Sequence, residues 1–339
     1  SKSDLINLYN IAWGYYSPLK GFLNSNDYRS VVDKMKLATG EDWTIPILLR
    51  IDKNKAELIR NENSLYLQFE DKVIGIISNI ELFKIDIKSD ARKIFDTDEL
   101  AHPGVKLFSN KGEYSISGEV NLFKDSEPEI LGYLNPFSFR KEIDSLKLSS
   151  FSTRNIPHIG HEYIQRVLLE TTEGLGILII SGAEISGKFK SEFVYNFYKE
   201  YSKQNYPQGR CHINRILLPP IYGGPREAFL QATVLQNLGY YSFIVGRDHA
   251  GCGNYYSKYA SQEIFKIATG LNINIIPFKE PRYCPFCQIV TTENSCPHTD
   301  ETKTALNGTY IRAALQIGDQ PSLQKILRLE SIRILKRFH

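Results

Sequence analysis

The pattern of hydrophobic and polar positions changes part of the way along the chain. Up to about Lys124 the apolar residues come in short alternating or β-branched runs separated by charged turns, which is typical of short strands. Helical periodicity interrupts them at Asp27–Leu37. We therefore predict a small, barrel-like β domain at residues 1–140. Its clearest predicted strands are Thr44–Leu49, Leu65–Phe69 and Val73–Ile77.

Beyond Pro136 longer apolar strands alternate with helices. The predicted strands are Lys147–Phe151, Ile177–Ile180, Ile216–Leu218 and Ser242–Val245, and the predicted helices are His161–Glu170, Glu192–Tyr201 and Arg226–Leu238. This order is typical of an α/β protein with a parallel sheet and helices on both faces, in which ligands bind beyond the carboxyl ends of the strands. We predict a Rossmann-like domain at residues 141–281 and a small region with a metal knuckle and helices at 282–339.

Composition and charge narrow the class of protein. A chain of 339 residues that is 42% hydrophobic and 23% charged can form two or three globular domains. Its net charge of +3 is too small to indicate a nucleic-acid partner, whereas a small polyanionic substrate fits. No apolar run approaches the roughly 20 residues of a membrane span, and Ser1–Asp4 does not begin a secretory signal. We expect a cytoplasmic protein that binds neither nucleic acid nor membrane.

A phosphate-binding motif follows the first strand of the α/β part. Residues 152–162 read STRNIPHIGHE, and Pro157 suits the first turn of a helix. His158 and His161 then lie three apart on one helix face, near free backbone amides and the positive end of the helix dipole. This arrangement predicts a phosphate site. The alternative is a pair of histidines that only cap or pack the helix.

A second motif follows the strand at Ser242–Val245. Residues 246–251 read GRDHAG; the glycines permit a tight turn close to a nucleotide, and Arg247 and His249 add hydrogen-bond donors. Taken alone, the motif also fits an ordinary turn with a surface salt bridge. We expect it to converge with the first motif, because both follow strands of one parallel sheet.

Three of the five cysteines lie close together in one short segment, which indicates a metal site rather than a disulfide scaffold. Cys284 and Cys287 form a C-x2-C knuckle, and Cys296 and His298 follow, with Asp300 as an alternative to His298. Three thiolates and an imidazole suit tetrahedral Zn²⁺. Four protein ligands leave no position for substrate, so we predict a structural ion. The alternative is three reduced cysteines in a loop.

The motifs, in this order, resemble those of the ATP sulfurylase (sulfate adenylyltransferase) family of the HxGH nucleotidyltransferase superfamily. That family carries Q-x-R-N-P-x-H-x-x-H, A-G-P-R-E-A, G-R-D-H-A-G and S-G-T-x-x-R. The matching segments here are Ser152–His161, Gly223–Ala228, Gly246–Gly251 and Asn307–Arg312. Tyr16–Phe22 and His102–Val105 are similar to the family's PUA-like amino-terminal domain. PUA-like folds can bind RNA, but a chain without a basic run favours a structural role.

The resemblance implies in-line attack by a sulfate oxygen on the α-phosphorus of MgATP, which gives adenylyl sulfate and pyrophosphate without a covalent enzyme intermediate. Arg154 and the backbone amide of Ala250 would hold the oxyanion. The catalytic residues implied by position are Arg154, Asn155, His158, His161 and Arg247. The implied nucleotide- or substrate-binding residues are Ser152, Thr153, Lys188, Arg226, Gly246, His249, Ala250 and Arg312. We also expect a homodimer.

The chain departs from the family pattern at several positions. Ser152 replaces a glutamine that helps to bind sulfate, and its shorter hydroxyl needs a water to reach the same oxygen. The loop Gly182–Phe189 nearly spells a P-loop, but Phe189 lacks the hydroxyl that would hold magnesium, and we interpret Lys188 as a substitute for the family's loop lysine. Two alternatives therefore stay open: a related nucleotidyltransferase with another acceptor or nucleotide, and a degenerate nucleotide-binding homologue without turnover.

Overall fold

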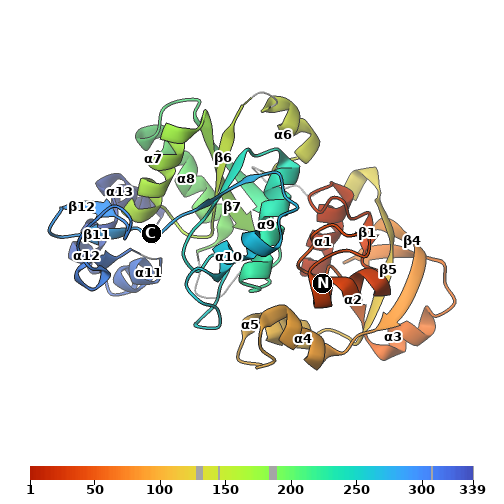
Figure 1. The fold of residues 1–339 in the computed structure, drawn as a ribbon. Helices are drawn as coiled ribbons and strands as arrows, with labels where there is room; N and C mark the ends of the chain where they lie inside the picture. Colours follow the sequence, from red (N-terminus) through yellow and green to blue (C-terminus); the bar gives the residue numbers. More distant parts are fainter. Residues whose placement is uncertain (127–132, 144–145, 183–188, 307, 339) are drawn as a thin grey trace.

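Three sheets organise the chain in the computed structural model, which describes residues 1–126, 133–143, 146–182, 189–306 and 308–338. An antiparallel sheet lies in the amino-terminal part, a parallel sheet lies at the centre, and a small antiparallel ribbon lies near the carboxyl end (Figure 1). In the described residues no helix is both long enough and apolar enough to cross a membrane.

The amino-terminal sheet has the order β1-β5-β4-β3, and β2 also pairs with β5. Its strands are β1 (Gly21–Phe22), β2 (Leu49–Ile51), β3 (Ser64–Phe69), β4 (Lys72–Lys84) and β5 (Tyr114–Leu122). The helices of this part are α1 (Lys2–Ala12), α2 (Ser25–Lys34), α3 (Lys53–Leu58), α4 (Ile87–Phe95) and α5 (Pro103–Ser109). The strands predicted from Leu65 and Val73 and the helix predicted from Asp27 are confirmed.

The strand predicted at Thr44–Leu49 is wrong, because only Leu49 enters β2. The apolar residues of this run, such as Ile45 and Ile47, are buried in the core and do not extend a ladder. Thr44 contacts the α/β part directly, since its Oγ1 donates to the carbonyl of Arg226 at 2.6 Å. The run is a packing segment between the two parts, which a hydrophobicity pattern does not distinguish from a strand.

The central sheet is parallel and has the order β10-β9-β6-β7-β8. Its strands are β6 (Leu148–Thr153), β7 (Gly174–Ser181), β8 (Cys211–Leu217), β9 (Ser242–Val245) and β10 (Asn274–Pro277). The helices are α6 (Pro136–Glu142), α7 (Ile159–Thr171), α8 (Ser191–Asn205), α9 (Pro225–Leu238) and α10 (Ala260–Ile267). The predicted α/β fold is confirmed, although α6, α10 and β10 were not predicted.

The strand order places a ligand crevice between β6 and β9. The chain leaves β6 in one direction to build β7 and β8, and it then crosses over to build β9 and β10 on the other side. Such a switch point opens a crevice beyond the carboxyl ends of the two strands. The two predicted motifs follow these two strands.

The amino-terminal part and the parallel-sheet part share one core. Tyr15 and Trp43 are buried in the same apolar cluster as Leu230 of α9. Asn237 Nδ2 donates to the Tyr15 carbonyl at 2.9 Å, and Asn10 Nδ2 donates to the Leu217 carbonyl at 2.9 Å. The β domain is therefore held against α9, close to the crevice.

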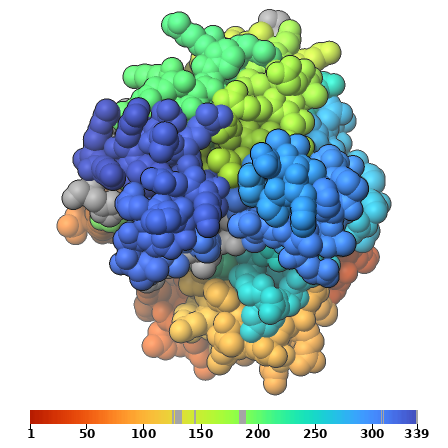
Figure 2. Space-filling model, turned by 90° about the vertical axis from the view of Figure 1, so that its left-hand side faces the viewer, coloured from red at the N-terminus to blue at the C-terminus, as the bar shows by residue number. Residues whose placement is uncertain are grey.

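The carboxyl-terminal region combines a ribbon of order β12-β11-β13 with three helices. Its elements are β11 (Arg282–Cys284), β12 (Ile289–Thr291), β13 (Thr304–Ala305), α11 (Gly308–Gln316), α12 (Gln320–Ile326) and α13 (Leu329–Phe338). Figure 2 shows this region in blue beside the green segments of the α/β part, and β12 and α13 contact α7 and α8 respectively.

A buried carboxylate anchors this region to α7. Glu162 accepts hydrogen bonds from Arg328, from Arg166 Nε at 2.6 Å and from Tyr201 Oη at 3.1 Å. Burial acts to raise the pKa of Glu162, but Arg328 and Arg166 outweigh it and lower that pKa. The carboxylate therefore stays ionised where α13 begins.

We expect Arg328→Met to lower the free energy of unfolding by about 2–4 kcal/mol, because it removes a charged donor from a buried carboxylate. Urea unfolding at pH 7 measures this change. Arg333→Met, on an exposed position of α13, is the matched control and should shift stability by less than about 0.5 kcal/mol. Equal midpoints for the two variants would show that Arg328 is not an anchor.

Candidate active site

A cavity of about 650 Å³ lies at the carboxyl ends of β6 and β9. Residues after β6, residues before α9, residues after β9 and the start of α11 form its walls. It brings together most residues expected at the site: Ser152, Thr153, Arg154, Asn155, His158, His161, Gly246, Arg247, His249, Ala250 and Arg312. Lys188 lies outside the described residues.

The two histidines of the first motif face each other at the start of α7. His158 is the N-cap residue, and its Nδ1 accepts the backbone N–H of His161 at 3.3 Å. The two imidazole rings stack with centroids 3.7 Å apart. Because Nδ1 of His158 is an acceptor, its neutral ring carries the proton on Nε2. His158 therefore caps the helix and also offers a donor to the cavity that it lines.

Burial keeps both rings neutral. It lowers the pKa of His158 well below the usual value, and neighbouring His161 lowers it further. Burial also lowers the pKa of His161 to about 4, while a backbone hydrogen bond with Ile156 acts in the opposite direction. Nδ1 of His161 is buried and has no partner among the described residues. The pair is thus a set of neutral hydrogen-bonding groups rather than two cations.

These shifts predict a loss of stability in acid. The pKa values of His161 and His249 are both lowered to about 4, so between pH 6.5 and 4 the unfolded chain binds more protons than the folded one. The contribution of each neutral histidine to the free energy of unfolding is fully present above pH 6.5. It is lost as the pH drops to about 4, by on the order of 2–3 kcal/mol for each group. Urea unfolding from pH 7.5 to 4 should give a shallower slope for His161→Asn than for wild type. Parallel slopes would contradict the neutral assignment.

Arg154 brings to the same cavity a positive charge that has no hydrogen-bonded partner among the described residues. Burial lowers the pKa of its guanidinium, while Glu227 and Tyr222 act in the opposite direction. No hydrogen bond or ion pair links this guanidinium to the described residues. A partly buried cation without a bonded partner costs free energy, and a bound anion offsets that cost. Arg154 is therefore suited to an oxyanion.

A residue from the carboxyl-terminal region orients Asn155. Arg312 Nη1 donates to Asn155 Oδ1 at 3.0 Å, which leaves the Asn155 amide nitrogen as a donor for a ligand. Thr153 Oγ1 accepts the backbone N–H of Asn155 at 3.0 Å, so this hydroxyl shapes the turn. Ser152 Oγ is buried and has no partner among the described residues.

The loop after β9 places two non-glycine residues in the left-handed region of backbone conformation. Asp248 and Ala250 have φ values of 52° and 57°, in the left-handed region that favours glycine. The Asp248 amide donates to the Lys258 carbonyl at 2.8 Å, and the Gly224 amide donates to the Ala250 carbonyl at 3.1 Å. Arg247 Nη1 pairs with Glu280 Oε1 at 3.2 Å. The Gly224 contact holds the loop against the start of α9, and the other two join it to the segments before α10 and β11.

Arg226 does not reach the cavity, contrary to the role expected from its motif. Its Nη1 donates to the carbonyls of Val31 and Thr44, and its Nη2 donates to the carbonyl of Val32. Arg226 therefore binds the last turn of α2 and joins the two parts of the chain. The next residue, Glu227, lines the cavity instead and was missed, although it belongs to the same motif.

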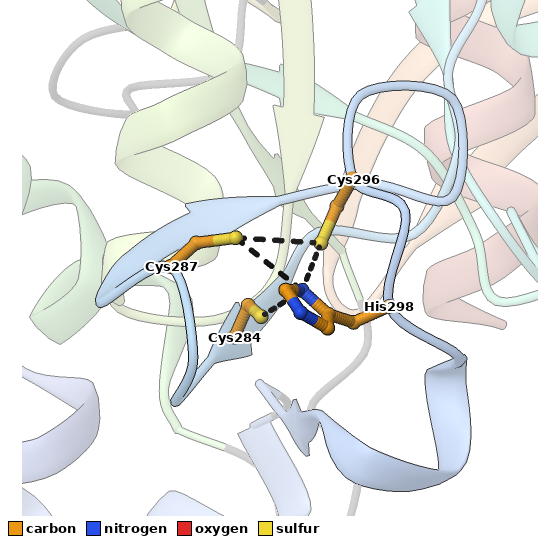
Figure 3. Close-up of side chains that lie close together, drawn as sticks. All are labelled: Cys284, Cys287, Cys296 and His298. Atoms are coloured by element: carbon orange, nitrogen blue, oxygen red, sulfur yellow. Dashed lines mark hydrogen bonds between the residues drawn. The ribbon is translucent and has the colours of Figure 1, made fainter.

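The predicted metal ligands converge beside the ribbon, at the end of β11 and in the segments between its strands. Figure 3 shows Cys284, Cys287, Cys296 and His298 pointing toward one another, and their ligand atoms all lie within 4.8 Å of each other. Asp300 is engaged elsewhere, since its Oδ1 lies 3.2 Å from Lys303 Nζ. The structure thus favours His298 over Asp300, and the cluster is a candidate metal site.

The fold and the cavity define a Rossmann-like nucleotidyltransferase with an attached β domain. The ATP-sulfurylase family model matches residues 133–338, and a PUA-like domain model matches residues 1–125. The chain therefore belongs to the ATP-sulfurylase family, which confirms the resemblance drawn from its motifs.

Curated relatives are similar in sequence to this chain along most of its length. A sulfate adenylyltransferase of Ignicoccus hospitalis is 35% identical over 97% of this chain and 87% of its own length. A sulfate adenylyltransferase of Thermococcus onnurineus is 34% identical over 98% of this chain and 88% of its own length. One of Carboxydothermus hydrogenoformans is 31% identical over 100% of this chain and 91% of its own length.

A solved structure shares the fold. The hexameric APS kinase from Thiobacillus denitrificans superposes with a TM-score of 0.73 and 17% identity over 99% of this chain. This chain spans 62% of that structure's chain.

Proposed function

We propose that this chain is a sulfate adenylyltransferase, which transfers AMP from MgATP to sulfate and gives adenylyl sulfate and pyrophosphate. The observation that carries the proposal is Arg154, a partly buried cation with no bonded partner among the described residues, in one cavity with the stacked pair His158 and His161. The names of the curated relatives support the same reaction.

The residues of the cavity have separate parts in this reaction. Arg154 holds the sulfate, whose oxygen bonds to the α-phosphorus while the bond from that phosphorus to the pyrophosphate oxygen breaks. The Nε2–H of His158 and the amide nitrogen of Asn155 donate to triphosphate oxygens as charge moves to the leaving group. Positioned donors of this kind act without a covalent intermediate. Mg²⁺, bound with ATP, neutralises part of the phosphate charge.

A second candidate keeps the nucleotidyl transfer but changes the acceptor. The observation that favours it is Ser152, whose Oγ has no partner among the described residues. Because this oxygen is buried, it is not exposed to an oxyanion in this arrangement. The acceptor site then rests chiefly on Arg154. Such a site can take an oxyanion of another size.

A screen of acceptors tests both candidates. Pyrophosphate release from MgATP is measured with sulfate, selenate, molybdate and phosphate, and His158→Ala is the negative control. We expect the highest kcat/KM with sulfate. A higher kcat/KM with another oxyanion would favour the second candidate, and tight ATP binding with no release on any acceptor would favour a homologue without turnover.

We further propose that the cysteine cluster holds structural Zn²⁺. Tetrahedral zinc, with Zn–S of about 2.3 Å and Zn–N of about 2.0–2.1 Å, separates two sulfurs by about 3.8 Å and a sulfur from the nitrogen by about 3.5 Å. The separation of Cys287 Sγ from Cys296 Sγ is 3.8 Å. His298 Nδ1 lies 3.4, 3.4 and 3.5 Å from the sulfurs of Cys284, Cys287 and Cys296. These distances support zinc with all four ligands.

The homodimer and the cytoplasmic location stay predictions. Sedimentation equilibrium of the purified protein tests the first, and we expect twice the mass of the 38.8 kDa chain.

A further inference from the structure

A chain of hydrogen bonds runs inside α9 to the loop after β9. Glu227 is buried; its Oε2 accepts the Gly223 amide at 3.1 Å, and its Oε1 accepts Gln231 Nε2 at 3.2 Å. Gln231 lies one turn further along α9 and is 2% exposed. Its Oε1 lies 2.8 Å from Nε2 of His249. The chain therefore links Glu227, Gln231 and His249.

The acceptor at one end fixes the direction of every bond in this chain. Both carboxyl oxygens of Glu227 accept hydrogen bonds, so Gln231 turns its amide nitrogen toward Glu227. Gln231 then presents its oxygen to His249, and Nε2 of His249 must carry the proton. Burial raises the pKa of the Glu227 carboxyl, while Arg154 and the hydrogen bonds from Gly223 and Gln231 act in the opposite direction. The neutral His249 ring consequently has its lone pair on Nδ1.

The ring of His249 lines the active-site cavity, and its Nδ1 is left for a ligand. The ring packs edge-on against Phe243, with centroids 5.2 Å apart. No hydrogen bond among the described residues uses Nδ1, and this atom is not buried, unlike Nδ1 of His161. His249 thus offers an acceptor, whereas the sequence suggested a donor.

An acceptor nitrogen in the cavity can bind only a ligand group that donates a hydrogen bond. Sulfate and the ionised triphosphate carry acceptor oxygens only, so they do not pair with a lone-pair nitrogen. The groups of MgATP that can donate are the exocyclic amine of adenine, the ribose hydroxyls and water bound to the metal. The first two belong to the nucleoside, and they distinguish one nucleotide from another.

We propose that Glu227 and Gln231 are positioning residues that hold His249 as a hydrogen-bond acceptor for an N–H or O–H group of the nucleoside. This inference rests on the proposed binding of ATP in the cavity. It assigns His249 to recognition of the nucleoside rather than to the phosphates, and it gives Gln231 a part in substrate choice although it is buried behind His249.

Nucleotide analogues that each lack one donor test the proposal. Wild type is compared with His249→Phe and Gln231→Leu, using ATP, purine riboside triphosphate without the amine, 2′-deoxy-ATP and 3′-deoxy-ATP. In wild type we expect one analogue to lose about tenfold in kcat/KM relative to ATP, as the loss of one hydrogen bond implies. The ratio of kcat/KM for ATP to kcat/KM for that analogue should fall to about one in His249→Phe. In Gln231→Leu the same ratio should fall at least threefold. The analogue that is affected identifies the amine or the hydroxyl.

A matched control separates recognition from stability. Gln236 also lies on α9, and its Oε1 accepts the Asn272 and Ile273 amides away from the cavity. Gln236→Leu should lower stability and leave the analogue ratios unchanged. Equal ratios for all analogues in wild type, or unchanged ratios in His249→Phe, would overturn the proposal.

The ring of His249 can also be observed directly. The ¹⁵N spectrum of labelled wild type, with the His249 signals found by difference from His249→Phe, should show the proton on Nε2 at pH 7, and Gln231→Leu should show a mixture of tautomers. A proton on Nδ1 in wild type would overturn the proposal. If no acceptor supports turnover, calorimetric binding of the same analogues still tests the inference, so its failure is distinguishable from failure of the proposed reaction.

Discussion

Replacing Arg154 by methionine should lower kcat/KM for sulfate by about 1,000-fold or more. Arg154 lines the cavity and has no bonded partner in the described part of the chain, so its guanidinium is available for two charge-assisted hydrogen bonds to an oxyanion. Each is worth about 1.5–3 kcal/mol, and each 1.4 kcal/mol is a factor of ten in rate. Initial rates of pyrophosphate release at varied sulfate and fixed MgATP measure the change. The KM for ATP should change much less.

Two further variants give this result its meaning. Arg154→Lys keeps the charge but loses the planar pair of donors, so we expect an intermediate loss of about 10- to 100-fold. Arg60→Met removes an exposed arginine outside the cavity and should leave both kinetic constants unchanged. If Arg154→Met raises the KM for ATP and leaves that for sulfate alone, Arg154 binds the nucleotide and the oxyanion assignment fails.

Removal of the metal should destabilise the carboxyl-terminal region by on the order of 10 kcal/mol, because binding free energy at a structural zinc site is folding free energy. Wild type should contain about one zinc ion per chain, and Cys287→Ser should lose most of it. Elemental analysis gives the metal content, and hydrogen exchange after chelation should show faster exchange in β11, β12 and α11. Activity should fall as well, since β13 leads directly into α11, which carries Arg312.

A cysteine outside the cluster provides the control for metal removal. Cys211 lies in β8, far along the chain from the four ligands, and Cys211→Ser should keep the full metal content. Full zinc content in Cys287→Ser, or unchanged exchange after chelation, would show that the cluster is not a structural metal site.

The features that could be predicted from sequence are those that depend on the hydrophobic pattern or residue spacing within a short segment. The apolar strands β6 and β9 and the helix that begins at Ile159 each follow from residues within one short window, and the order of strands and helices then placed both motifs at one edge. The four metal ligands also lie within one short segment of the chain. These predictions needed no long-range contact.

The features that could not be predicted depend on tertiary contacts. Thr44–Leu49 has the pattern of a strand but packs between two parts of the molecule, and Arg226 carries its charge to carbonyls of α2. His249 was expected to donate, and only the bonds through Gln231 to Glu227 make it an acceptor. The side chains that decide these roles come from other elements.

Exchange of labelled pyrophosphate into ATP tests the central claim most directly. It is measured with folded, zinc-loaded wild-type protein in the presence of MgATP, with and without sulfate, and with His158→Ala as the matched inactive variant. Exchange that depends on sulfate and falls at least about 100-fold in His158→Ala is the predicted result. No exchange in the presence of sulfate, from protein that still binds ATP, would contradict it.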